Sequence, residues 1–129
     1  MRLLLDTHVA LWAIGHPGKL TADIRGLLSD RANEIFVSVV TVWEIAIKYA
    51  VGKRTAPLVS AAEAAGYFRE SGYIFLDVTI EHAIAVENLP RIHGDPFDRL
   101  LVAQALSEPL RLITRDREVA GYSDTVILF

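Results

Sequence analysis

Short apolar runs alternate along the chain with longer segments in which apolar residues recur every three or four positions. The short runs are apolar on both faces, which is typical of strands that helices cover on two sides. The longer segments have the period of helices with one buried face. This alternation favours a parallel sheet built from β-α-β units over a sandwich or a helix bundle. Strands are expected at 2–5, 34–39, 73–78, 110–114 and 125–129, and helices at 8–14, 20–31, 41–51, 59–71, 79–89 and 96–107.

Few signals interrupt this pattern. Gly52 and Gly72 follow two of the helical segments and are expected to cap their C-termini. The tripeptide HPG at 16–18 is expected to form a turn. There is no internal repeat, low-complexity tract or linker, so residues 1–129 are expected to form a single domain.

Composition limits the chemistry. With 129 residues and 52% hydrophobic content, the chain can bury a core of ordinary size. The absence of cysteine excludes disulfides, thiolate catalysis and zinc–thiolate sites. Asp6 and His8 interrupt the apolar N-terminus before signal-peptide length, and no apolar run reaches the roughly 18 residues of a membrane span, so a cytoplasmic protein is expected.

The net charge of −3 gives no general attraction for polyanions. A nucleic acid or another polyanion would have to be held by a local basic patch or by a metal ion. Any functional site for such a ligand is therefore expected to be local.

The stretch HGDPFDRLLVAQA, residues 93–105, places two carboxylates three residues apart with a proline between them. Asp95 has the position of a helix N-cap, and Pro96 that of the first helical residue. Asp98 then lies in the first turn, where the helix dipole favours an acid. Helix capping and the dipole alone can account for both acids.

Asp6 and Asp116 each come just after a predicted strand. Ligands of open α/β sheets bind beyond the carboxyl ends of the strands, which is where a functional acid is expected. Each aspartate can equally cap the helix that follows it. Capping explains each acid separately and does not require the acids to converge.

Glu44 has two structural interpretations of its own. Thr41 and Glu44 have the spacing of a capping box, and Glu44 and Lys48 have that of a surface ion pair. Apart from Glu44 and Lys48, however, the segment from Val42 to Val51 is apolar, so the helix is expected to be buried. A buried acid needs a better partner than water.

Four blocks occur in a characteristic order and spacing: LLLDTHVALW, SVVTVWEIAIKYAVGK, DPFDRLLVAQA and LITRD. In these blocks the chain resembles the PIN-domain ribonucleases, and more closely the VapC-type toxins of bacterial toxin–antitoxin pairs. The resemblance implies a three-layer α/β/α fold around a central, mainly parallel sheet. It also implies an acidic metal site formed by Asp6, Glu44, Asp98 and Asp116, with Asp95 as an accessory or capping acid.

Such a cluster of acids has a physical reason in metal binding. Two carboxylates about 5 Å apart repel by roughly 3 kcal/mol at an effective dielectric constant near 20, so a cation or protons must neutralise them. Oxygen ligands suit Mg²⁺ or Mn²⁺, of which one or two ions would align a water for attack on a phosphodiester. Lys48, Arg99 and Arg115 are candidates for phosphate contacts, with ordinary surface charge as the alternative. The resulting hypothesis is a metal-dependent endoribonuclease.

Other enzyme classes fit less well. The sequence has no glycine-rich phosphate loop, no G-x-S-x-G and no H-E-x-x-H. An aspartate-based phosphatase would place a second aspartate where His8 stands. The four histidines have no ligand spacing and are expected at the surface or in packing, although His93 could lie near the site.

Two alternatives stay open: an RNA-processing nuclease outside a toxin–antitoxin pair, and a metal-stabilised interaction domain without catalysis. For the toxin interpretation, the resemblance implies three partners: the RNA substrate, a small antitoxin that covers the site and a groove between helices, and a second copy of the chain. Trp12, Trp43 and Tyr49 are compatible with such interfaces, and core packing is their alternative role.

Overall fold

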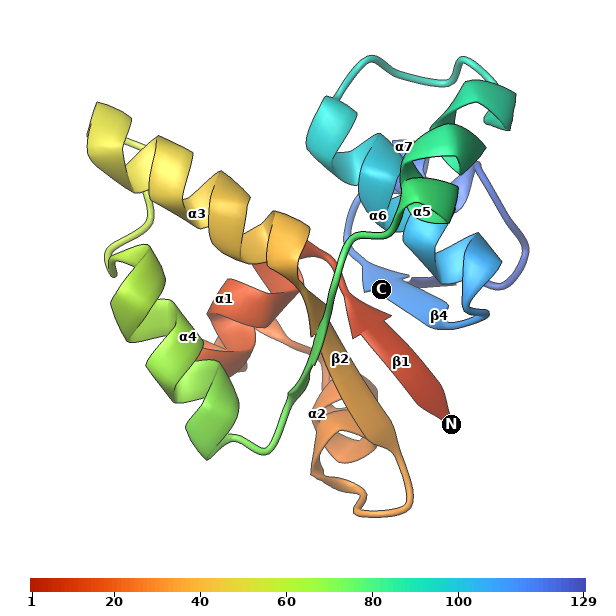
Figure 1. Cartoon of the computed structure of the whole chain (residues 1–129). Helices are drawn as coiled ribbons and strands as arrows, with labels where there is room; N and C mark the ends of the chain where they lie inside the picture. Colours follow the sequence, from red (N-terminus) through yellow and green to blue (C-terminus); the bar gives the residue numbers. More distant parts are fainter.

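The computed structural model describes residues 1–129 and is built around one five-stranded sheet. All strands are parallel and follow the order β3-β2-β1-β4-β5. Figure 1 shows β2, β1 and β4 side by side. The parallel sheet predicted from the sequence is therefore confirmed. The strands are β1 (Arg2–Leu5), β2 (Glu34–Ser38), β3 (Ile74–Leu76), β4 (Arg111–Thr114) and β5 (Ile127–Leu128).

Alternate residues of the strands supply two separate cores. Leu3 and Leu5 of β1 belong to one cluster of fully buried side chains, and Leu4 belongs to the other. Helices cover both faces, so the fold has the predicted three layers, α/β/α (Figure 1). The helices are α1 (Thr7–Gly15), α2 (Ala22–Ser29), α3 (Val39–Val51), α4 (Ala61–Glu70), α5 (Ile80–Ala85), α6 (Pro96–Ser107) and α7 (Arg117–Ala120), with two 3₁₀ turns, η1 (Pro17–Lys19) and η2 (Val86–Asn88).

The two cores draw on different helices. α1, α2 and α4 contribute to the cluster that contains Leu3, with Phe68 of α4 as its largest fully buried side chain. α6 and α7 contribute to the cluster that contains Leu4. α3 leaves the carboxyl end of β2 and adds Ile45 to the first cluster and Val40 to the second. This helix consequently lies between the two halves of the molecule.

Element boundaries differ from the prediction at several places. α3 begins at Val39 because the Ser38 hydroxyl accepts a hydrogen bond from Val40 N at 3.0 Å. The predicted capping box of Thr41 and Glu44 is therefore wrong, and Thr41 lies buried inside the helix. The predicted helix 79–89 ends at Ala85 and continues only as η2. α7 was not predicted, because four residues are too short for a recognisable period.

The predicted caps of two segments are present. Gly52 has a φ of 69°, the left-handed conformation that ends α3 without the steric cost of a side chain. Gly72 also has a positive φ, of 80°, just after α4.

None of the helices is both long and apolar enough to cross a membrane.

A buried polar network joins the end of β2, α5 and α6. Gln104 of α6 accepts a hydrogen bond from the Ser38 hydroxyl at 2.6 Å, and its amide nitrogen donates to Asp77 O at 3.2 Å. His82 lies beside Gln104 and is itself buried, with its Nε2 next to Glu108. These contacts satisfy polar groups that would otherwise be costly to bury, and they hold α6 beside the start of α3.

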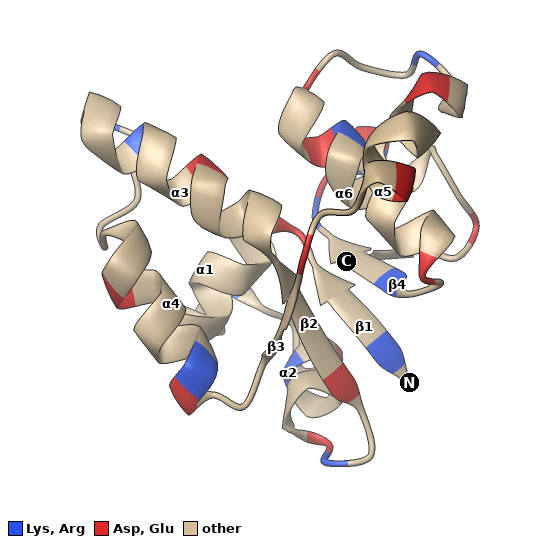
Figure 2. Cartoon of the chain, in the orientation of Figure 1, with Lys and Arg blue, Asp and Glu red and all other residues tan.

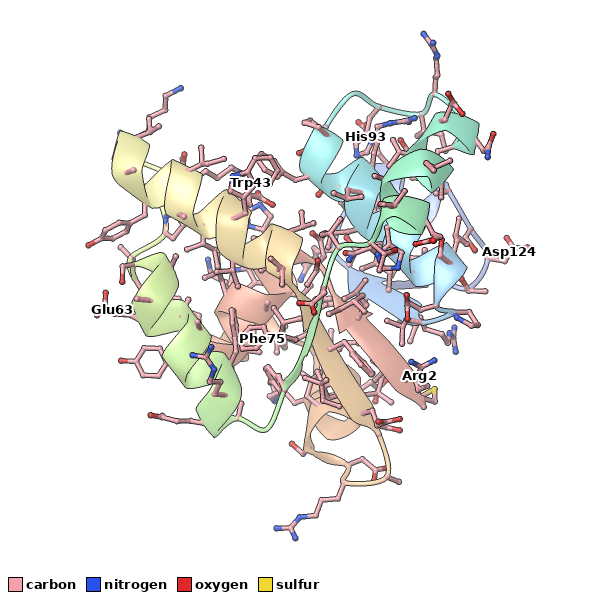
Figure 3. All side chains as sticks on the ribbon, viewed as in Figure 1. Arg2, Trp43, Glu63, Phe75, His93 and Asp124 are labelled. Atoms are coloured by element: carbon pink, nitrogen blue, oxygen red, sulfur yellow. The ribbon has the colours of Figure 1, made fainter.

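Several large apolar side chains of α3 remain exposed. Val39, Trp43, Ile47 and Val51 recur every four residues and form one stripe along the helix, here called the α3 stripe. Trp43, labelled in Figure 3, is 57% exposed, although the centre of its ring lies 5.2 Å from the centre of the Phe97 ring. An apolar stripe of this kind is more typical of an interface than of an isolated surface.

Candidate metal centre

The predicted acids converge because the strands that precede them are neighbours. β1 lies between β2 and β4, and parallel strands bring their carboxyl ends to the same edge of the sheet. Asp6 follows β1 and Asp116 follows β4, while Glu44 lies on the helix that follows β2. Asp98, in the first turn of α6, completes the group. All four line one cavity of about 370 Å³, which Asp95, His8, Trp12, Lys48 and Arg115 line as well.

Asp6 is buried in this group and is 5% exposed. One carboxylate oxygen accepts a hydrogen bond from Thr7 N at 2.7 Å, so Asp6 caps α1 as the structural interpretation expected. The other oxygen accepts a hydrogen bond from the Thr114 hydroxyl at 2.6 Å. Burial raises the pKa of the Asp6 carboxyl, and the hydrogen bonds from Thr114 and Thr7 only partly oppose this effect. Asp6 therefore both caps a helix and faces the cavity.

Glu44 is slightly more buried than Asp6, at 3% exposure. The Thr7 hydroxyl donates to its Oε1 at 2.9 Å and also lies 3.0 Å from the Thr41 hydroxyl. Lys48 Nζ pairs with the other oxygen, as the spacing predicted. Burial by itself would lower the pKa of Lys48, but the hydrogen bond and charge of Glu44, helped by Asp95 and Asp98, raise it. The ion pair is thus partly buried and lies in the wall of the cavity.

Asp95 and Asp98 have different positions, as expected. Asp95 is the N-cap of α6, because its Oδ1 accepts hydrogen bonds from Phe97 N at 2.9 Å and Asp98 N at 3.2 Å. Pro96 is the first residue of this helix, as predicted. Asp95 still lines the cavity, so capping does not remove it from the site.

The Asp98 carboxyl carries the clearest sign of crowded negative charge. Burial, with the charges of Asp6, Asp95 and Glu44, raises its pKa to about 7, and the hydrogen bond with His93 opposes this shift. His93 Nε2 lies 3.3 Å from Asp98 Oδ2, which places His93 at the site.

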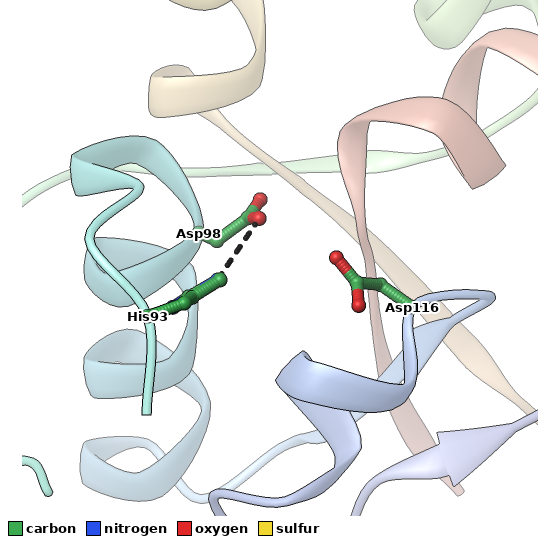
Figure 4. Close-up of side chains that lie close together, drawn as sticks. All are labelled: His93, Asp98 and Asp116. Carbon is green, nitrogen blue, oxygen red and sulfur yellow. Dashed lines mark hydrogen bonds and ion pairs between the residues drawn. The ribbon is translucent and has the colours of Figure 1, made fainter. Parts of the chain in front are cut away.

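Asp116 faces Asp98 from the opposite wall (Figure 4). It is exposed and caps α7, since its carboxylate accepts a hydrogen bond from Glu118 N at 2.8 Å. One ligand atom from each of His93, Asp98 and Asp116 lies within 4.8 Å of the other two. This spacing would allow the three side chains to approach one cation.

The predicted basic residues do not share one location. Lys48 and Arg115 line the cavity, and the Arg115 guanidinium also lies 5.4 Å from the centre of the Phe129 ring. Arg99 points elsewhere and donates to Pro90 O at 2.9 Å. Lys and Arg are spread over separate elements rather than gathered along one of them (Figure 2). Any attraction for phosphate at this site thus depends on a few side chains.

Sequence reasoning missed the hydroxyl groups that hold the acids. Thr7 donates to Glu44, and Thr114 donates to Asp6. Asp116 N in turn donates to the Thr114 hydroxyl at 3.0 Å. A signal was present, because each threonine stands next to a strand end and within two residues of an acid. A hydroxyl residue beside a strand-end acid is therefore worth including in such a prediction.

The donor set fits a hard divalent cation. Carboxylate oxygens are the ligands that Mg²⁺ and Mn²⁺ prefer, and no sulfur ligand is present. Burial, together with the neighbouring carboxylates, raises the pKa of Asp98 to about 7, so the positive charge already at the site does not offset its ionisation. A cation bound among Asp6, Glu44, Asp98 and Asp116 would supply that charge.

Two apolar hollows flank α1 next to the acidic cavity. One, of about 480 Å³, lies between α1 and α3 and includes Ile45 and Val51. The other, of about 490 Å³, includes Ile14 and Leu58. Leu11 and residues 55–57 line both hollows, and so does His8, which also lines the acidic cavity. The hollows thus form an apolar groove along α1, here called the α1 groove, that reaches the acidic cavity.

Comparison with known proteins agrees with this architecture. The family model of the PIN domain matches residues 3–124. The chain is 30% identical to Ribonuclease VapC22 of Mycobacterium tuberculosis, over 93% of this chain and 91% of that protein. Its structure is similar to VapBC2 from Rickettsia felis bound to a DNA fragment from their promoter, with a TM-score of 0.70 at 17% identity over 100% of this chain and 98% of that chain. It is also similar to DNA-bound VapBC from Salmonella typhimurium, with a TM-score of 0.68 at 20% identity over 100% and 97% of the two chains.

Proposed function

Since the chain belongs to the PIN domain family, we propose that it is a metal-dependent endoribonuclease and the toxin of a toxin–antitoxin pair. The observation that carries the proposal is the convergence of four carboxylates from separate segments on one cavity. The similarity of the chain to a VapC ribonuclease supports RNA as the substrate. Its similarity to VapBC complexes supports the toxin–antitoxin context.

In the proposed mechanism Asp6, Glu44, Asp98 and Asp116 would hold one or two Mg²⁺ or Mn²⁺ ions. When bound, such a cation would polarise a water for in-line attack on a phosphodiester and offset charge on the phosphate. Two threonines hold the carboxylates in place. The Thr7 hydroxyl donates a hydrogen bond to Glu44, and the Thr114 hydroxyl donates one to Asp6.

Two cations of the chain are placed to contact the substrate. Lys48 and Arg115 line the cavity, so their charges can attract RNA phosphates toward an otherwise acidic site. Arg99 is not included in this role, because its guanidinium donates to Pro90 O, Val86 O and the Tyr122 hydroxyl.

The proposal predicts that purified protein cleaves RNA in Mg²⁺ or Mn²⁺, and that EDTA abolishes the cleavage. Re-addition of either ion should restore it, because a divalent cation would activate the attacking water and offset charge on the phosphate. Gel analysis of a labelled RNA checks this, and Asp6→Asn protein prepared in parallel controls for a contaminating nuclease. Undiminished cleavage in EDTA would contradict the metal mechanism.

The cleavage assay, combined with two further observations, separates the proposed toxin from the two alternative functions. A metal-stabilised interaction domain would bind Mg²⁺, seen as a higher melting temperature, but would leave RNA intact. An RNA-processing nuclease outside a toxin–antitoxin pair would cleave RNA but would have no antitoxin encoded beside its gene. The sequence of the neighbouring reading frame therefore distinguishes these two nucleases.

We propose the α1 groove as the binding surface of the antitoxin. The groove is lined by apolar side chains together with Glu44, Lys48 and Lys53, and it reaches the acidic cavity at His8, Glu44 and Lys48, so one partner can occupy both. An apolar helix in the groove, followed by a basic side chain in the cavity, would match the two chemistries. Bound there, the antitoxin would exclude RNA from the carboxylates.

We also propose that the chain forms a homodimer through the α3 stripe. All four side chains are exposed; Ile47 and Val51 also line the α1 groove, so the proposed dimer contact is centred on Val39 and Trp43, and Trp43 supplies the large aromatic surface that dominates many interfaces. The stripe lies on the helix that carries Glu44, so pairing would place the two acidic cavities near the interface.

Light scattering coupled to size-exclusion chromatography tests both partner proposals. The chain alone should have twice the mass of one chain, and Trp43→Glu should reduce the mass to one chain by burying a charge at the interface. Co-expression with the small neighbouring protein should give a heavier complex, and Leu11→Glu should prevent this complex without dissociating the dimer. A monomer in the wild type would contradict the dimer proposal alone.

A further inference from the structure

A series of close polar contacts connects side chains outside the acidic cavity to the candidate metal centre. The Arg99 guanidinium donates to the Tyr122 hydroxyl at 3.1 Å, and that hydroxyl lies 2.7 Å from His93 Nδ1. On the other side of the imidazole, His93 Nε2 lies 3.3 Å from Asp98 Oδ2. Three side chains that no step of the proposed mechanism uses are therefore connected in series to one of the four acids.

The contacts of the Tyr122 hydroxyl determine which way its proton points. Its oxygen accepts hydrogen bonds from Arg99 Nη1 and, at 3.3 Å, from His93 N, so both lone pairs are used. The O–H must then donate, and His93 Nδ1 at 2.7 Å is a nearer acceptor than His93 O at 3.4 Å. Because Nδ1 accepts, the imidazole carries its proton on Nε2, directed at Asp98.

The surroundings keep this arrangement in place. Arg99 is anchored by Pro90 O at 2.9 Å and Val86 O at 3.3 Å, and Tyr122 belongs to the buried core. The His93 and Asp98 side chains are only 11% and 15% exposed. Water therefore has little access to replace the hydrogen bond between them.

We propose that Tyr122, supported by Arg99, is a positioning residue: it orients His93 so that Nε2–H holds the Asp98 carboxylate in its metal-binding orientation. This inference rests on the proposed metal site and names residues that act on it from outside. With Oδ2 restrained by His93, the carboxylate keeps Oδ1 free to face the cavity. Restraint of this kind lowers the cost of ordering a ligand when a cation binds.

The test is Mn²⁺ binding by Tyr122→Phe protein, measured by isothermal titration calorimetry. This change removes only the hydroxyl and keeps the buried ring. We expect Mn²⁺ affinity to fall about tenfold or more, the loss typical of removing a group that orients a metal ligand. Tyr67→Phe, at an exposed tyrosine of α4 that does not line the acidic cavity, is the matched control and should bind Mn²⁺ like the wild type.

Changes at His93 test the contact between His93 and Asp98 without disturbing the core at Tyr122. In His93→Gln the side-chain amide can still donate a hydrogen bond to Asp98, so most of the Mn²⁺ affinity should remain. In His93→Leu the donor is gone, and the affinity should fall as in Tyr122→Phe. A merely structural role would lower the melting temperature of these variants but would not produce this split between Gln and Leu.

The outcomes separate this inference from the proposed function. If the wild type binds Mn²⁺ and Tyr122→Phe binds it equally well, the positioning role is wrong and the metal site stands. If Tyr122→Phe is silent while both His93 variants lose binding, His93 is itself a ligand, which also overturns the inference. If the wild type does not bind Mn²⁺, the metal site fails and the inference fails with it.

Discussion

Replacing Asp98 with Asn should abolish Mg²⁺-dependent RNA cleavage while the protein stays folded. Asn has almost the shape of Asp but lacks the negative charge that a hard cation requires. Loss of a residue that merely orients a ligand costs roughly 10–100-fold, so loss of a ligand should cost on the order of a thousandfold. Cleavage rates at saturating Mg²⁺, normalised to folded protein, provide the measurement.

Asp95→Asn is the matched control for this variant. Asp95 lines the same cavity and lies three residues from Asp98, so the same charge is removed from the same helix end. Asn is nearly as good an N-cap as Asp, and the variant should therefore keep both its stability and most of its activity. Asp95→Ala should lose about 1 kcal/mol of stability and keep its activity per folded molecule.

The two carboxylates would have to exchange roles if these results came out the other way. Asp98→Asn protein that cleaves RNA like the wild type would remove Asp98 from the ligand set. An inactive but folded Asp95→Asn protein would instead make Asp95 a ligand as well as a cap. Melting curves of all three variants are needed, because an unfolded variant would also be inactive.

The hydrophobic pattern was sufficient for the parallel sheet, whereas the set of four acids came from the resemblance to PIN-domain ribonucleases. Runs such as RLLL at 2–5 are buried on both faces, and the structure places Leu4 in one core and its two neighbours in the other. Parallel strands have their carboxyl ends at one edge of the sheet, but only the structure shows that the strands before Asp6, Glu44 and Asp116 are neighbours, which brings these acids together.

The start of α3 shows one limit of this reasoning. Ser38 and Thr41 both carry a hydroxyl and both precede an apolar helical run, and either can cap a helix. Only the backbone shows that Ser38 is the cap, which leaves the Thr41 hydroxyl free to meet that of Thr7. Local spacing cannot choose between two chemically similar residues three positions apart.

Arg99 and Tyr122 show a second limit. Arg99 is next to Asp98 in the sequence, and it was therefore a candidate for contacting an RNA phosphate at the acidic site. Successive residues of a helix point about 100° apart, however, and Arg99 is directed toward carbonyl groups of the preceding loop. Tyr122 reaches His93 across 29 residues, a separation over which no periodic pattern operates. Contacts made through loops thus escape a sequence-based prediction.

Without metal, the wild type should become more stable as the pH falls from about 8 to about 5. The pKa of Asp98 is raised from 3.8 to about 7 in the folded state, so folding favours its protonated form. The stability that this proton contributes is fully present below the unfolded pKa and is lost as the pH rises through about 7. The raised pKa of Asp6 acts in the same direction.

A pKa raised by about three corresponds to at most about 4 kcal/mol of stability, at about 1.4 kcal/mol for each tenfold change in the protonation equilibrium. Because the Asp98 side chain is partly exposed, solvent screening should reduce this to about 2 kcal/mol, or roughly 6 °C in melting temperature. Thermal melts in EDTA between pH 5 and 8 measure the part of this stability that is lost above pH 5, about two thirds of it. Asp98→Asn has no carboxyl to titrate and should show a much flatter profile, with the remaining slope due to Asp6. Saturating Mg²⁺ should also flatten the wild-type profile, because the cation keeps the carboxylates ionised. Equal slopes for wild type and Asp98→Asn in EDTA would show that crowding of charge at Asp98 does not limit the stability of the metal-free protein.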